Sequence, residues 1–245
     1  MDVLTYLLIA VSIYLATTIT SLVGFADKLA MIAILSFFLD IKTSIFLSAI
    51  YSVFLYSFRI FFSHPHLNLR QLLKTQIFLI PGLLMGLLVF GNINSNMLKL
   101  VFSSFLVLFV IYQILFKDKF NLKINEFFLG VGIFLFGFLE STIGAAGPLL
   151  AVFLIQYGKS KERLVVFAAA ILIISSIVRI IGYAYLEGLH PGGIHLLYAL
   201  IPVAIISSYT GKRLISILHA KHFEWMVLVF ILALGIWGLV HPFLK

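Results

Sequence analysis

Two short segments of the chain combine small residues with charged ones in otherwise apolar surroundings. Residues 24–28 read GFADK, and residues 140–148 read ESTIGAAGP. Glycine and alanine let a ligand approach the backbone closely, and a helix that breaks there exposes backbone N–H groups. Such groups, at a helix start and beside lysine or arginine, bind anions. The chemistry that both segments favour is therefore anion binding.

A nucleotide site and simple helix packing are the alternatives to anion binding at the second segment. GAAGP lacks the Gly-Lys-Ser/Thr ending of a phosphate loop, and its glycine spacing is not that of a dinucleotide fingerprint. A nucleotide site is therefore excluded. Close packing of two membrane helices through small residues stays open as the alternative to a binding site.

Cationic side chains extend the expected site beyond the two segments. Arg59 and Arg179 lie in apolar stretches, where charge is costly and often functional. They either guard an anion path or extend to the lipid headgroups, as arginine near a helix end does. The predicted substrate-binding residues are Gly24, Phe25, Ala26, Lys28, Arg59, Gly144, Ala145, Ala146, Gly147, Pro148 and Arg179.

Two carboxylates near the segments are candidates for proton coupling. Asp27 adjoins Lys28, and a simple ion pair between these neighbours is slightly favoured over proton coupling. Glu140 lies in an otherwise apolar stretch, and burial there disfavours the charged form of a carboxyl. A hydrogen-bonded structural role for Glu140 is an equal alternative.

The rest of the chain must position these residues inside a membrane. Of 245 residues, 62% are hydrophobic and 11% are charged, too little polar surface to cover a soluble domain. Stretches of about twenty apolar residues can cross a hydrocarbon core of about 30 Å. They cover residues 3–23, 43–62, 72–90, 97–116, 127–143, 164–186, 194–209 and 223–240, whereas 29–39 and 148–157 are about half as long. These lengths predict an all-α polytopic membrane protein.

The second half of the chain repeats the layout of the first. Each half has a long stretch, a glycine-containing break, a short stretch, a basic loop and three long stretches. A shift of 120 residues, or 121 for the last pair, aligns Ser21 with Ser141, Gly24 with Gly144, Arg59 with Arg179 and Pro81 with Pro202. The prediction is two transmembrane repeats, 1–118 and 119–245, each of about five helices with one short half-helix.

Basic residues decide between eight and ten membrane crossings, because they collect on the cytoplasmic side. If both short stretches cross, twelve cations share one side: Lys28, Arg70, Lys74, Lys117, Lys119, Lys123, Lys159, Lys161, Arg163, Lys212, Arg213 and Lys221. Only Lys42, Lys99 and Lys245 then lie opposite, whereas eight crossings divide the cations nine to six. The ten-crossing topology is favoured. Five crossings is an odd number, so the two repeats are inverted relative to each other.

The overall composition limits which binding partners and cofactors are expected. The net charge of +8 is explained by basic membrane loops, so nucleic acid is not an expected partner. The chain has no cysteine, which excludes disulfides and thiol relays. Its seven histidines suggest no metal site, and no cofactor is expected. The expected partners are a small anion and membrane lipids, and a homodimer remains open.

Residues 144–173, GAAGPLLAVFLIQYGKSKERLVVFAAAILI, followed by RIIGYAYLEG at 179–188, resemble the TauE/SafE family of sulfite-exporter-like permeases. The first copy, GFADKLAMIAILSFFL at 24–39, departs from the family, which usually has glycines where Ala26, Asp27 and Lys28 stand. The resemblance implies a secondary transporter, not an enzyme, in the cell inner or plasma membrane. Its substrate would be a small sulfur-containing or organic anion such as sulfite, a sulfonate or sulfoacetate. Asp27 and Lys28 favour a changed substrate or coupling ion.

Two functions of other classes are weaker alternatives. A membrane enzyme that acts on lipids needs carboxylates, histidines or a nucleophile gathered at one face, and the nine acidic residues are scattered. A non-transporting scaffold would instead pack Gly24 and Gly144 into a dry interface without a substrate cavity.

Overall fold

The structure, a computed structural model, describes residues 3–21, 27–63, 68–116, 125–156, 161–187, 195–215 and 220–240. These residues form ten helices and no strand. The helices are α1 (Val3–Ser21), α2 (Asp27–Leu35), α3 (Ile41–Ser63), α4 (Leu69–Asn92), α5 (Ser95–Phe116), α6 (Glu126–Ile143), α7 (Gly147–Gln156), α8 (Lys161–Glu187), α9 (Leu196–Ile215) and α10 (Ala220–Val240). Each long hydrophobic stretch is helical over the residues that the structure describes, so the predicted all-α fold is confirmed.

Within the described residues, five helices are long and apolar enough to cross a membrane: α3, α4, α5, α6 and α8. Shorter apolar segments lie in α1, α9 and α10. Leu73, Ile77 and Leu88 on α4 are each more than 60% exposed, while Leu79 and Leu83 on the same helix are fully buried. A helix that is apolar on both its inner and its outer face is typical of a membrane span.

The two short stretches are separate short helices, as predicted. Helix α2 has 9 residues and α7 has 10, so each rises only about 15 Å at 1.5 Å per residue. Gly144 ends α6 in the left-handed conformation, with φ of 83°. Pro148 follows as the second residue of α7, where a missing N–H costs no helical hydrogen bond.

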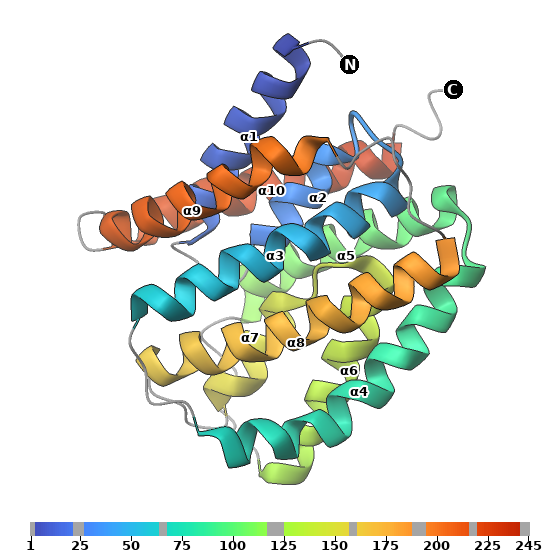
Figure 1. Cartoon of the computed structure of the whole chain (residues 1–245), viewed down its shortest axis with the longest axis vertical. Helices are drawn as coiled ribbons and strands as arrows, with labels where there is room; N and C mark the ends of the chain where they lie inside the picture. The colour runs from blue at the N-terminus through green and yellow to red at the C-terminus, as the bar shows by residue number, and fades with distance from the viewer. Residues whose placement is uncertain are drawn as a thin grey trace.

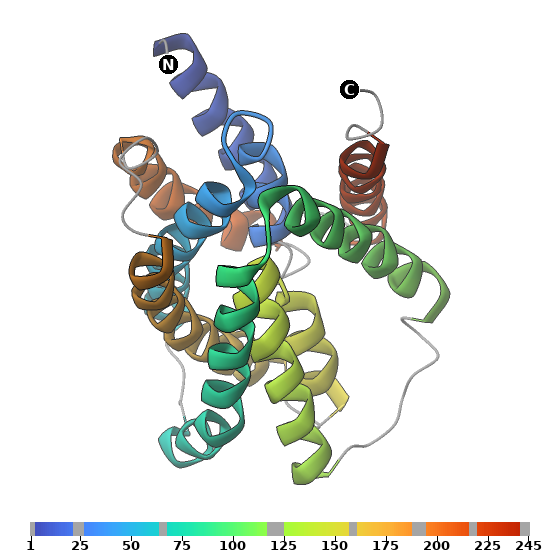
Figure 2. The ribbon, with the colours of Figure 1, turned by 90° about the vertical axis from the view of Figure 1, so that its right-hand side faces the viewer.

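The helices pack in pairs that recur between the two halves. Figure 1 shows α3 and α8 side by side through the middle of the molecule, and Figure 2 shows α4 beside α6. When α1–α5 are matched in order with α6–α10, the contact of α4 with α6 corresponds to that of α9 with α1. Likewise, α3 with α9 corresponds to α8 with α4, and α1 with α2 corresponds to α6 with α7.

Small residues bring α4 and α6 into close backbone contact. A methyl group at Gly86 would overlap the carbonyl oxygen of Phe138, and one at Gly82 would overlap that of Phe134. These α4 glycines therefore serve close helix packing, the role that small residues often have in membrane proteins.

All nine residues of α2 are buried, including its two charged residues, Asp27 and Lys28. Met31 belongs to one apolar core cluster and Leu29 to the other, so α2 lies between them. The topology count treated Lys28 as a loop cation, which is wrong, because its side chain lies in α2 and is only 2% exposed. Without Lys28 the count is eleven to three, and the ten-crossing topology is still favoured.

Candidate functional site

The break between α6 and α7 is built around Glu140. The Gly144 N–H donates to the main-chain oxygen of Glu140 at 3.0 Å, which closes the last turn of α6. The Ala146 N–H, next to the start of α7, donates to Oε2 of Glu140 at 2.7 Å. The free N–H group that the sequence predicts at this helix start therefore faces an anion, and that anion is the chain's own carboxylate.

Two cations from distant helices meet the other oxygen of Glu140. Oε1 accepts from Lys28 Nζ of α2 and from Arg179 Nη1 of α8. The side chains are 2% exposed for Lys28 and 0% exposed for Glu140 and Arg179. We call these three residues the central charge cluster. Arg179 does not extend to the membrane surface, so the headgroup alternative is excluded for it in this structure.

Further polar contacts hold the two cations in place. Arg179 Nε donates to the Tyr183 hydroxyl at 3.0 Å, and this hydroxyl donates to the Ser141 main-chain oxygen at 2.6 Å. Lys28 Nζ lies 3.5 Å from Ser176 Oγ. The Arg179 and Lys28 head groups are thus tied to both α6 and α8.

A second ion pair lies beside the central charge cluster. Arg59 Nη2 of α3 donates to Asp27 Oδ2 at 2.9 Å, and Asp27 is 0% exposed. The ring centroid of Tyr56 lies 5.4 Å from Lys28 Nζ and 5.3 Å from Arg59 Cζ, so this ring contacts both cations. The neighbours Asp27 and Lys28 therefore have different partners, and the predicted pairing between them is wrong.

The five charged residues carry more positive than negative charge. Three cations, Lys28, Arg59 and Arg179, face two carboxylates, Asp27 and Glu140. In the part of the chain that the structure describes, Arg179 Nη2 and the Tyr56 hydroxyl are buried without a hydrogen-bond partner. A buried cation and an unpaired buried donor both cost free energy. A bound anion would lower this cost.

The structure brings together most of the predicted site residues that it describes. Lys28 and Arg179 join Glu140, Arg59 joins Asp27, and Gly144, Ala145, Ala146, Gly147 and Pro148 are buried at the break. Gly24, Phe25 and Ala26 lie outside the described residues. Sequence reasoning missed Tyr56, Ser176 and Tyr183. Helical spacing was a signal for all three, because Tyr56 lies three residues before Arg59, and Ser176 and Tyr183 lie three before and four after Arg179, on the same helix faces.

We expect Gly144→Ala to destabilise the protein. A left-handed backbone costs a non-glycine residue about 1–2 kcal/mol. The added methyl group would also lie 2.8 Å from Ile32 Cδ1 and 3.1 Å from Arg179 Nη2. Thermal unfolding in detergent measures the loss. Gly91→Ala is the control, because the three atoms nearest to a methyl group there all belong to the flexible Leu186 side chain, at 3.3 Å or more. Equal unfolding temperatures for the two variants would contradict the expectation.

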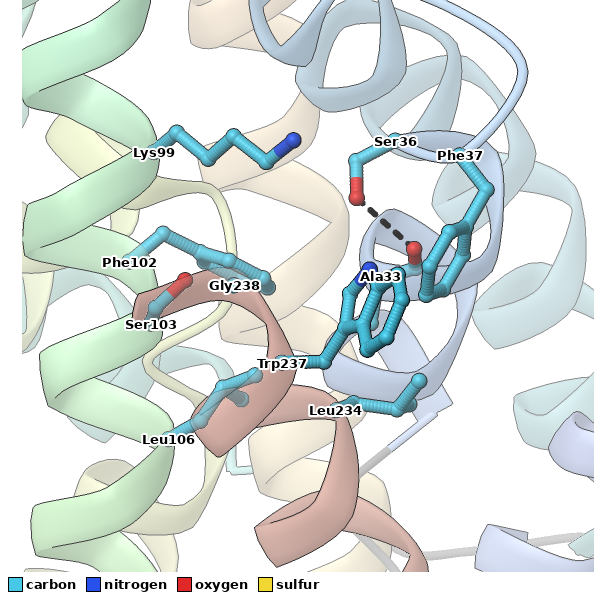
Figure 3. A pocket seen from close by; sticks show the side chains of 10 residues that line it. All are labelled: Ala33, Ser36, Phe37, Lys99, Phe102, Ser103, Leu106, Leu234, Trp237 and Gly238. Atoms are coloured by element: carbon cyan, nitrogen blue, oxygen red, sulfur yellow. Dashed lines mark hydrogen bonds between the residues drawn. The ribbon is translucent and has the colours of Figure 1, made fainter. Parts of the chain in front are cut away.

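A small cavity lies near the C-terminal end of α2, between α2, α5 and α10 (Figure 3). Ser36, Lys99, Ser103 and Trp237 are among its lining residues, and its volume is about 20 Å³. This is room for about one water molecule. The cavity is too small for an organic anion, and none of the central charge cluster lines it.

Comparison with known proteins identifies the family. The family model described as sulfite exporter TauE/SafE matches residues 8–238. No curated protein and no solved structure matches the chain. The match covers nearly the whole sequence, and the apolar helices suit a multi-pass membrane protein. The chain therefore belongs to the TauE/SafE family of membrane sulfite exporters.

Proposed function

We propose that the protein is a secondary transporter of small, sulfur-containing or organic anions, and that it binds them at the central charge cluster. The observation that carries this proposal is the buried excess of positive charge at the α6–α7 break, with Arg179 Nη2 left unpaired. A sulfonate or sulfite group has three oxygens, and charge-assisted hydrogen bonds to them are strong. Lys28 Nζ, the Arg179 guanidinium and the Ala146 N–H are three such donors around one point.

The same cluster joins the two halves of the chain. Lys28 lies in the first turn of α2, and Ala146 immediately precedes α7, yet both contact the one carboxylate of Glu140. We infer that residues 1–118 and 119–245 are inverted repeats and that the substrate binds between them. The matched order of helices and the recurring helix pairs support this arrangement. Because the cluster is buried, the substrate enters when the repeats move relative to each other.

The inverted ten-crossing topology predicts that positions 42 and 159 lie on opposite sides of the plasma membrane. The chain has no native cysteine, so Lys42→Cys and Lys159→Cys each carry a single thiol. A membrane-impermeant maleimide added to intact cells should label the cysteine at position 42 and spare the one at position 159 until the cells are opened. Labelling of both in intact cells would contradict the topology.

Transport is tested with purified protein in liposomes. Vesicles loaded with unlabelled sulfite, methanesulfonate or sulfoacetate should accumulate the labelled form of at least one of them by counterflow. Protein-free vesicles are the control. No counterflow of any of the three anions would overturn the proposed substrate class.

A further inference from the structure

We propose that the Glu140 carboxylate occupies the place of the substrate in this structure, and that a bound anion displaces it while Glu140 takes up a proton. This inference rests on the proposed transport function. It adds the reason for coupling, namely that substrate and Glu140 compete for the same donors.

Glu140 has the contacts of a bound anion. Its two oxygens accept from Lys28 Nζ, Arg179 Nη1 and the Ala146 N–H. These donors come from α2, from α8 and from the backbone just before α7, and they surround one carboxylate. They are also the groups that a sulfonate would need. One set of donors cannot satisfy both anions at once, so binding requires the carboxylate to leave.

The charge of the cluster requires a proton to accompany this displacement. With Glu140 ionised, the central charge cluster carries two positive charges and one negative charge. A monovalent anion together with a displaced but still ionised Glu140 would leave that carboxylate buried without its donors. An uncompensated buried charge costs several kcal/mol. A proton on the displaced carboxyl removes this cost and restores the original charge of the cluster.

The other titratable groups around Glu140 leave it as the carboxylate that exchanges the proton. Among the described residues, the titratable or charged groups that contact Glu140, or contact one of its partners, are Lys28 on α2, Tyr56 on α3, and Arg179 and Tyr183 on α8, and the pair of Asp27 and Arg59 lies beside them. The buried residues of α4 and the whole of α7 contain no titratable group. Lys99 of α5 lines the separate small cavity. Asp27 is held by Arg59, so Glu140 is the carboxylate that faces the donors.

Net transport and anion exchange make different demands on Glu140. Net uptake requires the empty transporter to return to the side of the membrane from which it takes up substrate. The ionised Glu140 makes this return possible, because its negative charge neutralises part of the positive charge of Lys28 and Arg179. With Glu140→Gln, the buried positive charges of Lys28 and Arg179 have a counter-ion at this point only when an external anion is bound. That variant should exchange an anion on one side of the membrane for an anion on the other. It should not be able to reorient its binding site without a bound anion.

The experiment compares the wild type, Glu140→Gln and Glu126→Gln in liposomes that contain a pH-sensitive dye. Glu126 is an exposed residue at the start of the same helix, so Glu126→Gln is the matched control. The probe is labelled methanesulfonate, which stays ionised throughout the working pH range, so any proton that moves is carried by the protein. The wild type and the control should take up about one proton for each anion, because this keeps the buried charge constant. Glu140→Gln should lose net uptake and keep counterflow, and its counterflow should no longer depend on pH.

The outcomes separate this inference from the proposed function. If the wild type shows no counterflow of methanesulfonate, sulfite or sulfoacetate, the transport function is overturned and the inference with it. If counterflow is present but net uptake moves no proton, only the inference is overturned. Loss of counterflow in folded Glu140→Gln also overturns it. Should that variant not fold, calorimetry of methanesulfonate binding to the wild type in two buffers of different ionisation enthalpy decides: uptake of a proton supports the inference, and no uptake overturns it.

Discussion

Replacing Arg179 with alanine is expected to weaken anion binding by about a hundredfold or more. A hydrogen bond to a charged group contributes about 1.5–3 kcal/mol, and 1.4 kcal/mol corresponds to a tenfold change in affinity. The substitution removes Nη1, which contacts Glu140, and Nη2, the buried donor without a partner. Lys28 and Glu140 would remain as a neutral pair, and an anion that displaces Glu140 would meet one cation instead of two. Because the remaining pair is neutral, the variant should still fold.

The measurement is the dissociation constant of the transported anion for detergent-purified protein, together with counterflow in liposomes. Arg70→Ala removes an exposed arginine at the start of α4 and serves as the control. Arg179→Lys retains a charge but loses the second guanidinium nitrogen, so its affinity should fall between those of the wild type and Arg179→Ala. If Arg179→Ala binds the anion as tightly as Arg70→Ala does, Arg179 is not a substrate ligand.

Replacing Arg59 with alanine should instead act mainly on stability. Asp27 is 0% exposed and accepts a hydrogen bond from Arg59 at 2.9 Å. Removing one partner of a buried ion pair typically costs about 3–5 kcal/mol, because the other charge remains buried. Because Arg59 lies on α3 and Asp27 is the first residue of α2, the loss should loosen α3 from the start of α2.

A double-mutant cycle of Arg59→Ala and Asp27→Asn measures this interaction. The second substitution removes the buried negative charge, so it should be much less harmful in the Arg59→Ala background than in the wild type. We expect a coupling free energy of about 1–3 kcal/mol from unfolding in mixed micelles. Additive effects of the two substitutions would show that the ion pair does not stabilise the protein.

These two arginines are aligned by the sequence repeat, yet their surroundings differ. Arg59 pairs with Asp27 and is 13% exposed. Arg179 is fully buried and shares its carboxylate with Lys28. The repeat therefore predicts which positions carry an arginine. The ion-pair partners of the two arginines decide that the surplus positive charge lies at Arg179.

The sequence by itself determined the helices and the short segments after the breaks. The length of a hydrophobic stretch and the conformations of glycine and proline are local properties. The sequence alone therefore predicts a helix break at residues 144–148. It also singled out Lys28, Glu140 and Arg179, because charge in an apolar stretch is costly and therefore informative.

Only the tertiary structure decided which charges meet. Lys28 and Glu140 are 112 residues apart, and no local pattern connects them. Asp27 and Lys28 were expected to pair because they are adjacent, but neighbours on a helix point in different directions and do not face each other. Each therefore finds its partner on another helix, Asp27 on α3 and Lys28 on α6. The packing of α2, α6 and α8 brings two cations to one carboxylate, because a buried charge is stable only beside its counter-ion.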